Sequence, residues 1–196
     1  MKLIQNGIVY ELNHQLMTAK VIESPFVANT VFIPRSIIHD SKEYLIVRIE
    51  SNAFKGNQHI YSVIFDENSE VKTIGNNIFS VTNIIRFSIP AKLETIEEGW
   101  CQSNQNLIEI EVSPTNKYFK LVNDQILIMS NKKNDEHTII FVARNTRRAT
   151  IPSHVTRIAP FSFQNCNRLE ELIFESNSKL NSIGQNAFQY TNLTNF

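Results

Sequence analysis

The sequence predicts a β-dominated solenoid, in which short repeated units stack and share one continuous core. The main observation is internal repetition, because the segment 65–79 returns, position by position, as the segment 174–188. A unit this short cannot bury a hydrophobic face alone, so its copies must stack on one another. The composition agrees, since 42% of the residues are hydrophobic and 13 are Phe.

Each repeat contains one isoleucine that marks its register. These isoleucines are Ile49, Ile74, Ile96, Ile158 and Ile183. The fifth residue after each is usually aromatic, and these residues are Phe54, Phe79, Cys101, Phe163 and Phe188. The long interval between the third and fourth isoleucines predicts an insertion, whereas the other intervals are single repeats. We therefore expect the five isoleucines to form one buried column.

After each of these positions comes a short alternation of apolar and polar residues, which predicts a strand with one buried face. The residues expected to face the core are Val63, Phe65, Phe87, Ile89, Ile110, Val112, Leu172 and Phe174. The stretch before each strand is short and rich in Asn and Ser. This composition favours short turns or single helical turns between the strands over long helices.

The repeat resembles that of the BspA-like leucine-rich repeat family, which is of surface-antigen type. The residues that carry the resemblance lie in the segments 49–54, 74–79, 158–169 and 183–188. The resemblance implies a leucine-rich-repeat solenoid over residues 47–196. It also implies that residues 1–46 form an N-terminal β-hairpin cap and a first incomplete unit, with segments 6–13 and 31–34 in the cap.

An insertion is expected at about residues 113–148. Two strand-like runs, 125–129 and 138–142, are joined by the turn-forming and charged segment 131–137, which predicts a β-hairpin. A shorter hairpin is expected around residues 39–42. The long hairpin either extends a binding surface or covers an irregular junction, and the sequence favours neither interpretation.

The sequence does not predict an enzyme. Its five histidines are scattered, and it contains no C-x-x-C pair, nucleophile elbow or Gly-rich phosphate loop. We therefore expect no metal and no cofactor. The 19 basic and 19 acidic residues balance, which argues against a nucleic-acid partner. No run approaches about 18 uninterrupted apolar residues, so no membrane span is expected.

A few individual residues depart from the repeat. Trp100 and Cys101 reverse the small-then-large order of other repeats and are expected to pack in the core. Cys166 occupies a position that is Asn in other repeats, which suggests a small side chain that contacts a neighbouring backbone. The cluster Arg144, Arg147 and Arg148 is expected to lie in a solvated loop, with a contact to an anionic partner as the alternative.

Strand residues that alternate with the core-facing ones are expected to form rows on one concave sheet face. They are Ser62, Ile64, Arg86, Ser88, Glu109, Glu111, Thr150, Glu171 and Ile173. Mixed charge beside exposed isoleucines suits a protein ligand better than a phosphate backbone. The alternative is a solvated face with incidental charges.

We therefore expect a non-enzymatic protein-recognition module whose partner is a protein. The family resemblance implies adhesion or binding to host or matrix proteins at the cell surface or in a secreted form, although residues 1–10 do not read as a signal peptide. The alternative is an intracellular protein-interaction scaffold, and a glycan on Asn192 would distinguish the two. The C-terminal repeat lacks a polar cap, so we expect either that the chain is a fragment or that a partner or a second copy, by self-association, covers this end.

Overall fold

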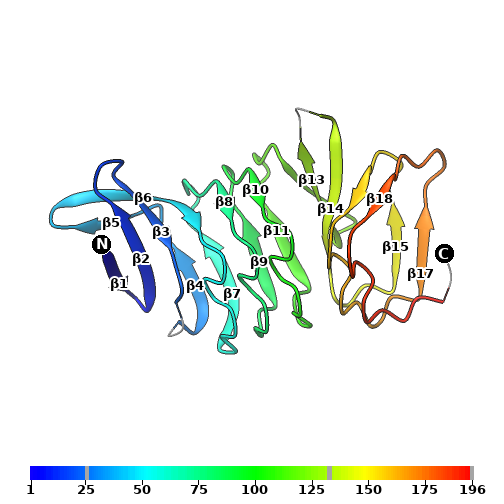
Figure 1. Cartoon of the computed structure of the whole chain (residues 1–196), viewed down its shortest axis with the longest axis horizontal. Coiled ribbons are helices and arrows are strands. Elements are labelled where there is room, and N and C mark those ends of the chain that lie inside the picture. The colour runs from blue at the N-terminus through cyan, green and yellow to red at the C-terminus, as the bar shows by residue number, and fades with distance from the viewer. Residues whose placement is uncertain (25–26, 132–133, 195–196) are drawn as a thin grey trace.

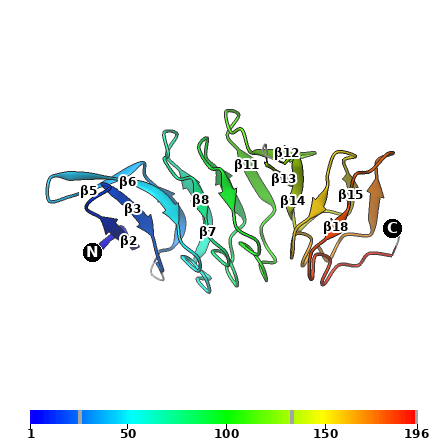
Figure 2. The ribbon, with the colours of Figure 1, turned by 45° about the horizontal axis from the view of Figure 1, so that its top comes forward.

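The computed structural model describes residues 1–24, 27–131 and 134–194. These residues form a solenoid of about seven turns in which the secondary structure is strand and turn, with no helix. The strands lie across the long axis of the stack, and the first and last described coils lie at its opposite ends (Figures 1 and 2). The predicted solenoid is therefore confirmed, with short turns rather than helical turns between its strands.

One sheet begins at the N-terminus and follows the order β1-β2-β3-β6-β8-β10, with β5 paired to β6. Its strands are β1 (Lys2–Gln5), β2 (Ile8–Asn13), β3 (Thr18–Val21), β5 (Ser36–His39), β6 (Lys42–Ile49), β8 (Thr73–Ile74) and β10 (Thr95–Ile96). The first three strands are antiparallel, whereas β3, β6, β8 and β10 are parallel. Both the N-terminal cap and the short hairpin around residues 39–42 are thus present.

The second sheet is parallel and follows the order β11-β9-β7-β4. Its strands are β4 (Asn29–Ile33), β7 (Ile60–Phe65), β9 (Arg86–Ile89) and β11 (Glu109–Val112). Placing segment 31–34 in the cap was wrong, because residues 31–33 belong to β4 and pair in parallel with β7. The first rung of this sheet therefore comes earlier in the chain than the sequence suggested.

The C-terminal coils carry two further sheets. One has the order β12-β13-β14-β16-β18, and the other is the parallel pair β15-β17. Their strands are β12 (Phe119–Val122), β13 (Ile126–Asn131), β14 (Glu136–Val142), β15 (Arg148–Ile151), β16 (Arg157–Ile158), β17 (Glu171–Phe174) and β18 (Ser182–Ile183). The inserted hairpin is confirmed as β13 and β14, and β12 adds a third antiparallel strand that the sequence did not reveal. Two residues of its connecting segment, 132–133, lie outside the described residues.

Each coil turns through corners in which the backbone is left-handed. The third residue after the repeat isoleucine has a positive φ in each repeat, as at Asn52, Asn77 and Asn186. The seventh residue also has a positive φ, as at Gly56 and Asn165. Asn and Gly enter this conformation at the lowest steric cost, so an Asn-rich connection closes as tight turns and not as a helical turn.

The repeat isoleucines pair from coil to coil, but in two ladders and not in the single column that was expected. Ile49, Ile74 and Ile96 pair in one ladder, and Ile158 and Ile183 in another. The first four are at most 3% exposed, but Ile183 is 54% exposed because it lies in the last described coil. Phe174 is 37% exposed for the same reason, so its predicted core position is wrong.

The inserted hairpin divides the core in two. Leu127 and Phe141 pack into the N-terminal hydrophobic cluster, whereas Ile126, Ile139 and Val142 pack into the C-terminal one. Both faces of its base are therefore buried, which explains its near-continuous apolar sequence. The base of the hairpin is thus an internal wall of the solenoid. In Figure 1 only its far end rises beyond the neighbouring coils.

Candidate functional site

The predicted site residues lie on the outward side of the parallel strands, which we call the sheet face. It consists of the outward side chains of β4, β7, β9, β11, β15 and β17. Register aligns Thr30, Ser62, Arg86 and Glu109 in one row. In a second row Phe32 pairs with Ile64, and Ser88 pairs with Glu111.

Exposure differs among the predicted residues. The exposed ones are Arg86, Glu109, Glu111 and Ile173. The half-buried ones are Ser62, Ile64, Ser88, Thr150 and Glu171. Since none is fully buried, alternation along the strands correctly separated the outward residues from the core.

Two equivalent ion pairs cross the sheet face. The Nε of Arg86 lies 2.6 Å from the Oε2 of Glu109, which is its partner on the next strand. The Nε of Arg148 lies 2.5 Å from the Oε2 of Glu171, again between adjacent strands. Exposed pairs of this kind contribute about 0–1 kcal/mol to stability, so their main effect is to fix charge positions for recognition.

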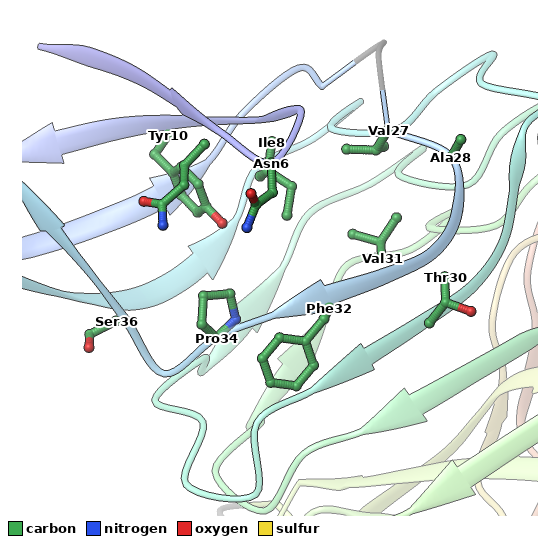
Figure 3. A pocket seen from close by; sticks show the side chains of 11 residues that line it. Asn6, Ile8, Tyr10, Val27, Ala28, Thr30, Val31, Phe32, Pro34 and Ser36 are labelled. Carbon is green, nitrogen blue, oxygen red and sulfur yellow. The ribbon is translucent and has the colours of Figure 1, made fainter.

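The N-terminal end of the sheet face is apolar and includes Phe32, which is not among the residues predicted from the sequence. Phe32 on β4 is 50% exposed and Ile64 beside it is half-buried. Phe32 and Pro34 line a pocket of about 380 Å³ that also involves Ile8 and Tyr10 of the cap (Figure 3). Assigning segment 31–34 to the cap concealed Phe32. The alternation of residues 29–33 was the signal that could have found it.

A second pocket lies where the strands end. Its volume is about 290 Å³, and its lining includes Ser88 and Glu111 together with Phe65 and Pro90. Two of the predicted residues are therefore brought together at one concavity. Backbone turns after β7, β9 and β11 complete it, since Asp66, Ala91 and Ser113 are also lining residues.

The sheet face is interrupted between β11 and β15. Thr150, Glu171 and Ile173 lie on the β15-β17 pair, which is separate from the four-stranded sheet. The structure thus brings six of the nine predicted residues together on one sheet and places these three on another. The sheet that begins at the N-terminus is interrupted at the same place, because it ends at β10 and the next sheet begins at β12.

Arg144 lies at this break, between β14 and β15. Its predicted place in a solvated loop is wrong. Its side chain is 3% exposed. Its Nη1 group donates to the carbonyl oxygens of Val142 at 3.2 Å and Ser162 at 3.0 Å. The guanidinium also lies over the ring of Phe141, 4.6 Å from its centroid. Because Ile139 pairs with Ile158, Arg144 occupies the position that is Phe163 in the next coil.

The two cysteines flank this guanidinium. The Sγ of Cys101 lies 3.6 Å from Nη2 of Arg144, and the Sγ of Cys166 lies 3.7 Å from Nη1. Both thiols are buried and free. Burial raises the pKa of Cys101 to about 11 and raises that of Cys166 above its ordinary value. Neither thiol is therefore an activated nucleophile at neutral pH.

The remaining predicted core residues have structural contacts. Trp100 is 2% exposed and its ring meets those of Phe79, Phe87 and Phe141 at centroid distances of 5.3–6.0 Å. Asn104, in the position of Cys166, donates to the Thr82 carbonyl oxygen at 3.0 Å. The backbone contact expected for this position is thus present.

The described residues offer neither a metal site nor a membrane-spanning helix. No group of three or more His, Cys, Asp or Glu side chains is placed to hold a metal ion in this part of the chain. The same residues contain no helix long and apolar enough to cross a membrane.

The fold and the repeat define a leucine-rich repeat protein. The sequence matches the model of the BspA type leucine-rich repeat region, with six copies, over residues 29–126 and 125–196. The chain therefore belongs to the BspA-type leucine-rich repeat family, whose repeats form protein-interaction modules.

Solved structures of similar fold come from several bacteria. A leucine-rich repeat protein from Eubacterium ventriosum has a TM-score of 0.50 at 16% identity, with 95% of this chain and 62% of that chain covered. A leucine-rich cell surface protein from Faecalibacterium prausnitzii has a TM-score of 0.48 at 16% identity, with 96% and 73% covered. The pneumococcal vaccine antigen PcpA has a TM-score of 0.42 at 17% identity, with 94% and 66% covered. Curated proteins give no significant match to the sequence.

Proposed function

We propose that this protein is a non-enzymatic recognition module that binds a partner protein across the sheet face. The observation that carries the proposal is the pair of in-register rows, which place apolar Phe32 and Ile64 beside the charged pair Arg86 and Glu109. An apolar patch next to fixed charges is typical of protein interfaces, where the apolar part gives affinity and the charges give specificity.

The chemistry of the partner follows from this arrangement. Phe32 and Ile64 require an apolar side chain opposite them, and aromatic anchors commonly carry much of the binding energy. Glu111 has no ion-pair partner within 4 Å among the described residues, so it is available to a basic side chain of the partner. We therefore expect a protein ligand that presents an apolar residue beside a Lys or Arg.

The test compares capture by the wild type and by Glu109→Lys/Glu111→Lys. Both are immobilised and exposed to a panel of purified extracellular-matrix proteins and to a cell extract. We expect the variant to lose partners that the wild type retains, since two charge reversals oppose a basic ligand. Equal capture of every partner by both proteins would exclude the sheet face.

The matched control is Glu94→Lys/Glu98→Lys. These residues flank β10 in the other sheet, and the double change alters net charge by the same amount. It also breaks one close ion pair, because Glu98 lies 2.5 Å from Arg157, much as Glu109 lies 2.6 Å from Arg86. The control is expected to retain wild-type capture. If it loses the same partners, the effect is one of net charge alone.

We propose that the protein acts at the cell surface, as the family resemblance implies. Self-association through the last coil is a further proposal, supported by the exposed apolar residues Phe174, Ile183 and Tyr190. Residues 195–196, at the end that was expected to be uncapped, lie outside the described residues. Sedimentation over a range of concentrations tests this proposal, and a monomer at every concentration would contradict it.

A further inference from the structure

A polar pocket opens at the break between β11 and β15, apart from the rows of the sheet face. Its volume is about 470 Å³, which is within the range of small-ligand sites. The lining includes two arginines and four amide side chains. These are Arg144, Arg168, Gln105, Asn106, Asn145 and Asn167.

The pocket forms because the coil that contains Arg144 is short. The corner of the following coil bonds directly to the coil before it. Asn165 donates from Nδ2 to the Asn104 carbonyl oxygen at 3.1 Å, and the Ser103 backbone N–H donates to Oε1 of Gln164 at 2.7 Å. The short coil lies between these two coils in the sequence, and among the described strands its sheet strand β15 pairs only with β17. A space lined by four successive coils results.

The positive charge at this pocket lacks a counter-charge. No lining residue is acidic. Arg168 is exposed and has no ion-pair partner within 4 Å among the described residues. Of the carboxylates on the adjoining strands, Glu109 pairs with Arg86 and Glu171 pairs with Arg148, and Glu170 lines a different pocket together with Arg147. The local field therefore favours an anion.

Arg144 provides an independent observation. A buried guanidinium normally has an anionic partner, because burying an unpaired charge costs several kcal/mol. Here its described hydrogen-bond acceptors are two backbone carbonyl oxygens and two sulfurs, all neutral. Its Nε is buried and has no hydrogen-bond partner in the described part of the chain. The thiols do not supply the missing charge, since burial raises the pKa of Cys101 to about 11 and also raises the pKa of Cys166.

We infer that this pocket binds a compact oxyanion carried on a hydroxylated ligand, such as a sugar acid or a sugar phosphate. The exposed Arg168 binds the oxyanion directly, and the buried charge of Arg144 adds to the positive field of the pocket. The geometry of arginine suits both carboxylate and phosphate groups. The four amides both donate and accept hydrogen bonds, which fits hydroxyl groups on the rest of the ligand.

A ladder of asparagine side chains beside the pocket supports the role of the amide groups in binding ligand hydroxyls. Asn83 donates from Nδ2 to the Gln58 carbonyl oxygen at 2.9 Å, and Asn106 donates from Nδ2 to Oδ1 of Asn83 at 3.2 Å. This ladder ends at Asn106, where the sheet breaks. The Oδ1 of Asn106 is therefore free to accept a hydrogen bond from a ligand hydroxyl within the described structure.

The experiment titrates the whole chain with glucuronate, glucose 6-phosphate and glucose, and follows backbone amide shifts by NMR. We expect saturable shifts for at least one anionic sugar, centred on Asn106, Asn145 and Asn167, and none for glucose at the same concentration. Which anion binds more tightly then identifies the oxyanion as carboxylate or phosphate. Absence of saturable binding for both anions, or equal binding of glucose, would overturn the inference.

The variant Arg168→Gln tests the charge, and Arg147→Gln is its matched control. Both residues are exposed and lose the same charge, but Arg147 does not line this pocket. We expect Arg168→Gln to weaken anion binding about tenfold or more, as the loss of one charge-assisted hydrogen bond predicts. Arg147→Gln should bind as the wild type does. Equal weakening in both variants would mean that the anion responds only to net charge. The inference does not depend on the sheet-face proposal, because neither arginine belongs to the sheet face.

Discussion

The N-terminal and C-terminal halves of the solenoid use the same repeat, but only the first is continuous. In the first half β4, β7, β9 and β11 form one sheet, whereas the second half retains only β15 and β17. The coil that begins at Ile139 reaches its sheet strand after fewer residues than the coils that begin at Ile96 and Ile158. Coil length, and not only repeat identity, therefore decides whether a ladder continues.

The junction between the halves is held by side chains where backbone ladders are missing. The indole Nε1 of Trp100 donates to the Ile140 carbonyl oxygen at 3.4 Å, and its ring packs on Phe141 of β14. Arg157 and Glu98 form an ion pair across the same junction. A few large contacts thus replace a regular array of backbone hydrogen bonds, so the junction depends mainly on the buried contacts of Trp100. The partly exposed pair of Arg157 and Glu98 adds at most about 1 kcal/mol.

The largest effect is expected for Trp100→Ala. The side chain is buried and contacts three rings, so its removal should lower the free energy of unfolding by about 3–5 kcal/mol. Because Trp100 joins the halves, we also expect chemical denaturation to separate into two transitions. Phe54→Ala, in the continuous half, is the control. It should destabilise the protein without separating the transitions, and two transitions in both variants would contradict a special role for the junction.

Arg144→Met should act in the opposite direction. The substitution removes a buried charge that has only neutral acceptors and puts an apolar chain in the position that Phe163 occupies in the next coil. Replacement of buried charge by apolar side chains is neutral or stabilising by about 1–4 kcal/mol. Denaturation without added anion measures this, with Arg168→Met as an exposed control expected to change stability by less than about 0.5 kcal/mol. A clear loss of stability in Arg144→Met would mean that the charge is compensated.

Local patterns in the sequence were sufficient for most of the fold. The isoleucine register, the inserted hairpin and the outward positions on each strand were all predicted. These features depend on alternation and spacing within one or two repeats. Because similar units pair with one another, the same register is repeated along the stack. The position of Ile183 in its ladder was predicted for the same reason, although its exposure was not.

What the sequence did not reveal depends on contacts between coils of different length. Arg144 was assigned to a solvated loop because Arg147 and Arg148 follow it, and a charged cluster usually lies at the surface. Its burial results from the pairing of Ile139 with Ile158, which makes β14 both a hairpin strand and the start of a coil. Counting five residues from Ile139 would have placed Arg144 in the Phe position, but Ile139 had been assigned to the insertion alone.

The glycines after two repeat isoleucines test how tightly each half is packed. A Cβ on Gly75 would lie 2.4 Å from the backbone N of Ser51, and one on Gly184 would lie 2.4 Å from that of Pro160. Gly75→Ala should therefore cost about 1–3 kcal/mol, as overpacking does in well-packed cores. Gly184→Ala should cost less, since the last coil is covered on one side only and can move. Equal losses in thermal denaturation would contradict this difference.

The smallest effect is expected from the titration of His154 in the C-terminal half. Burial lowers the pKa of His154 below its ordinary value of 6.5, and the neighbouring His137 and Lys120 lower it further, with Lys179 in the same direction and Glu175 opposed. The folded protein therefore binds a proton at His154 less readily than the unfolded chain does. Its contribution to stability is complete above the ordinary pKa and is lost as pH falls through that value and then through the lower folded pKa. In His154→Gln the decline in melting temperature over this pH range should be shallower than in the wild type. His59→Gln, which changes an exposed histidine of the continuous half, should decline as the wild type does. The rings of His137 and His154 lie close together, with their centroids 5.0 Å apart. If both variants change the slope equally, the pH dependence does not come from this pair of rings.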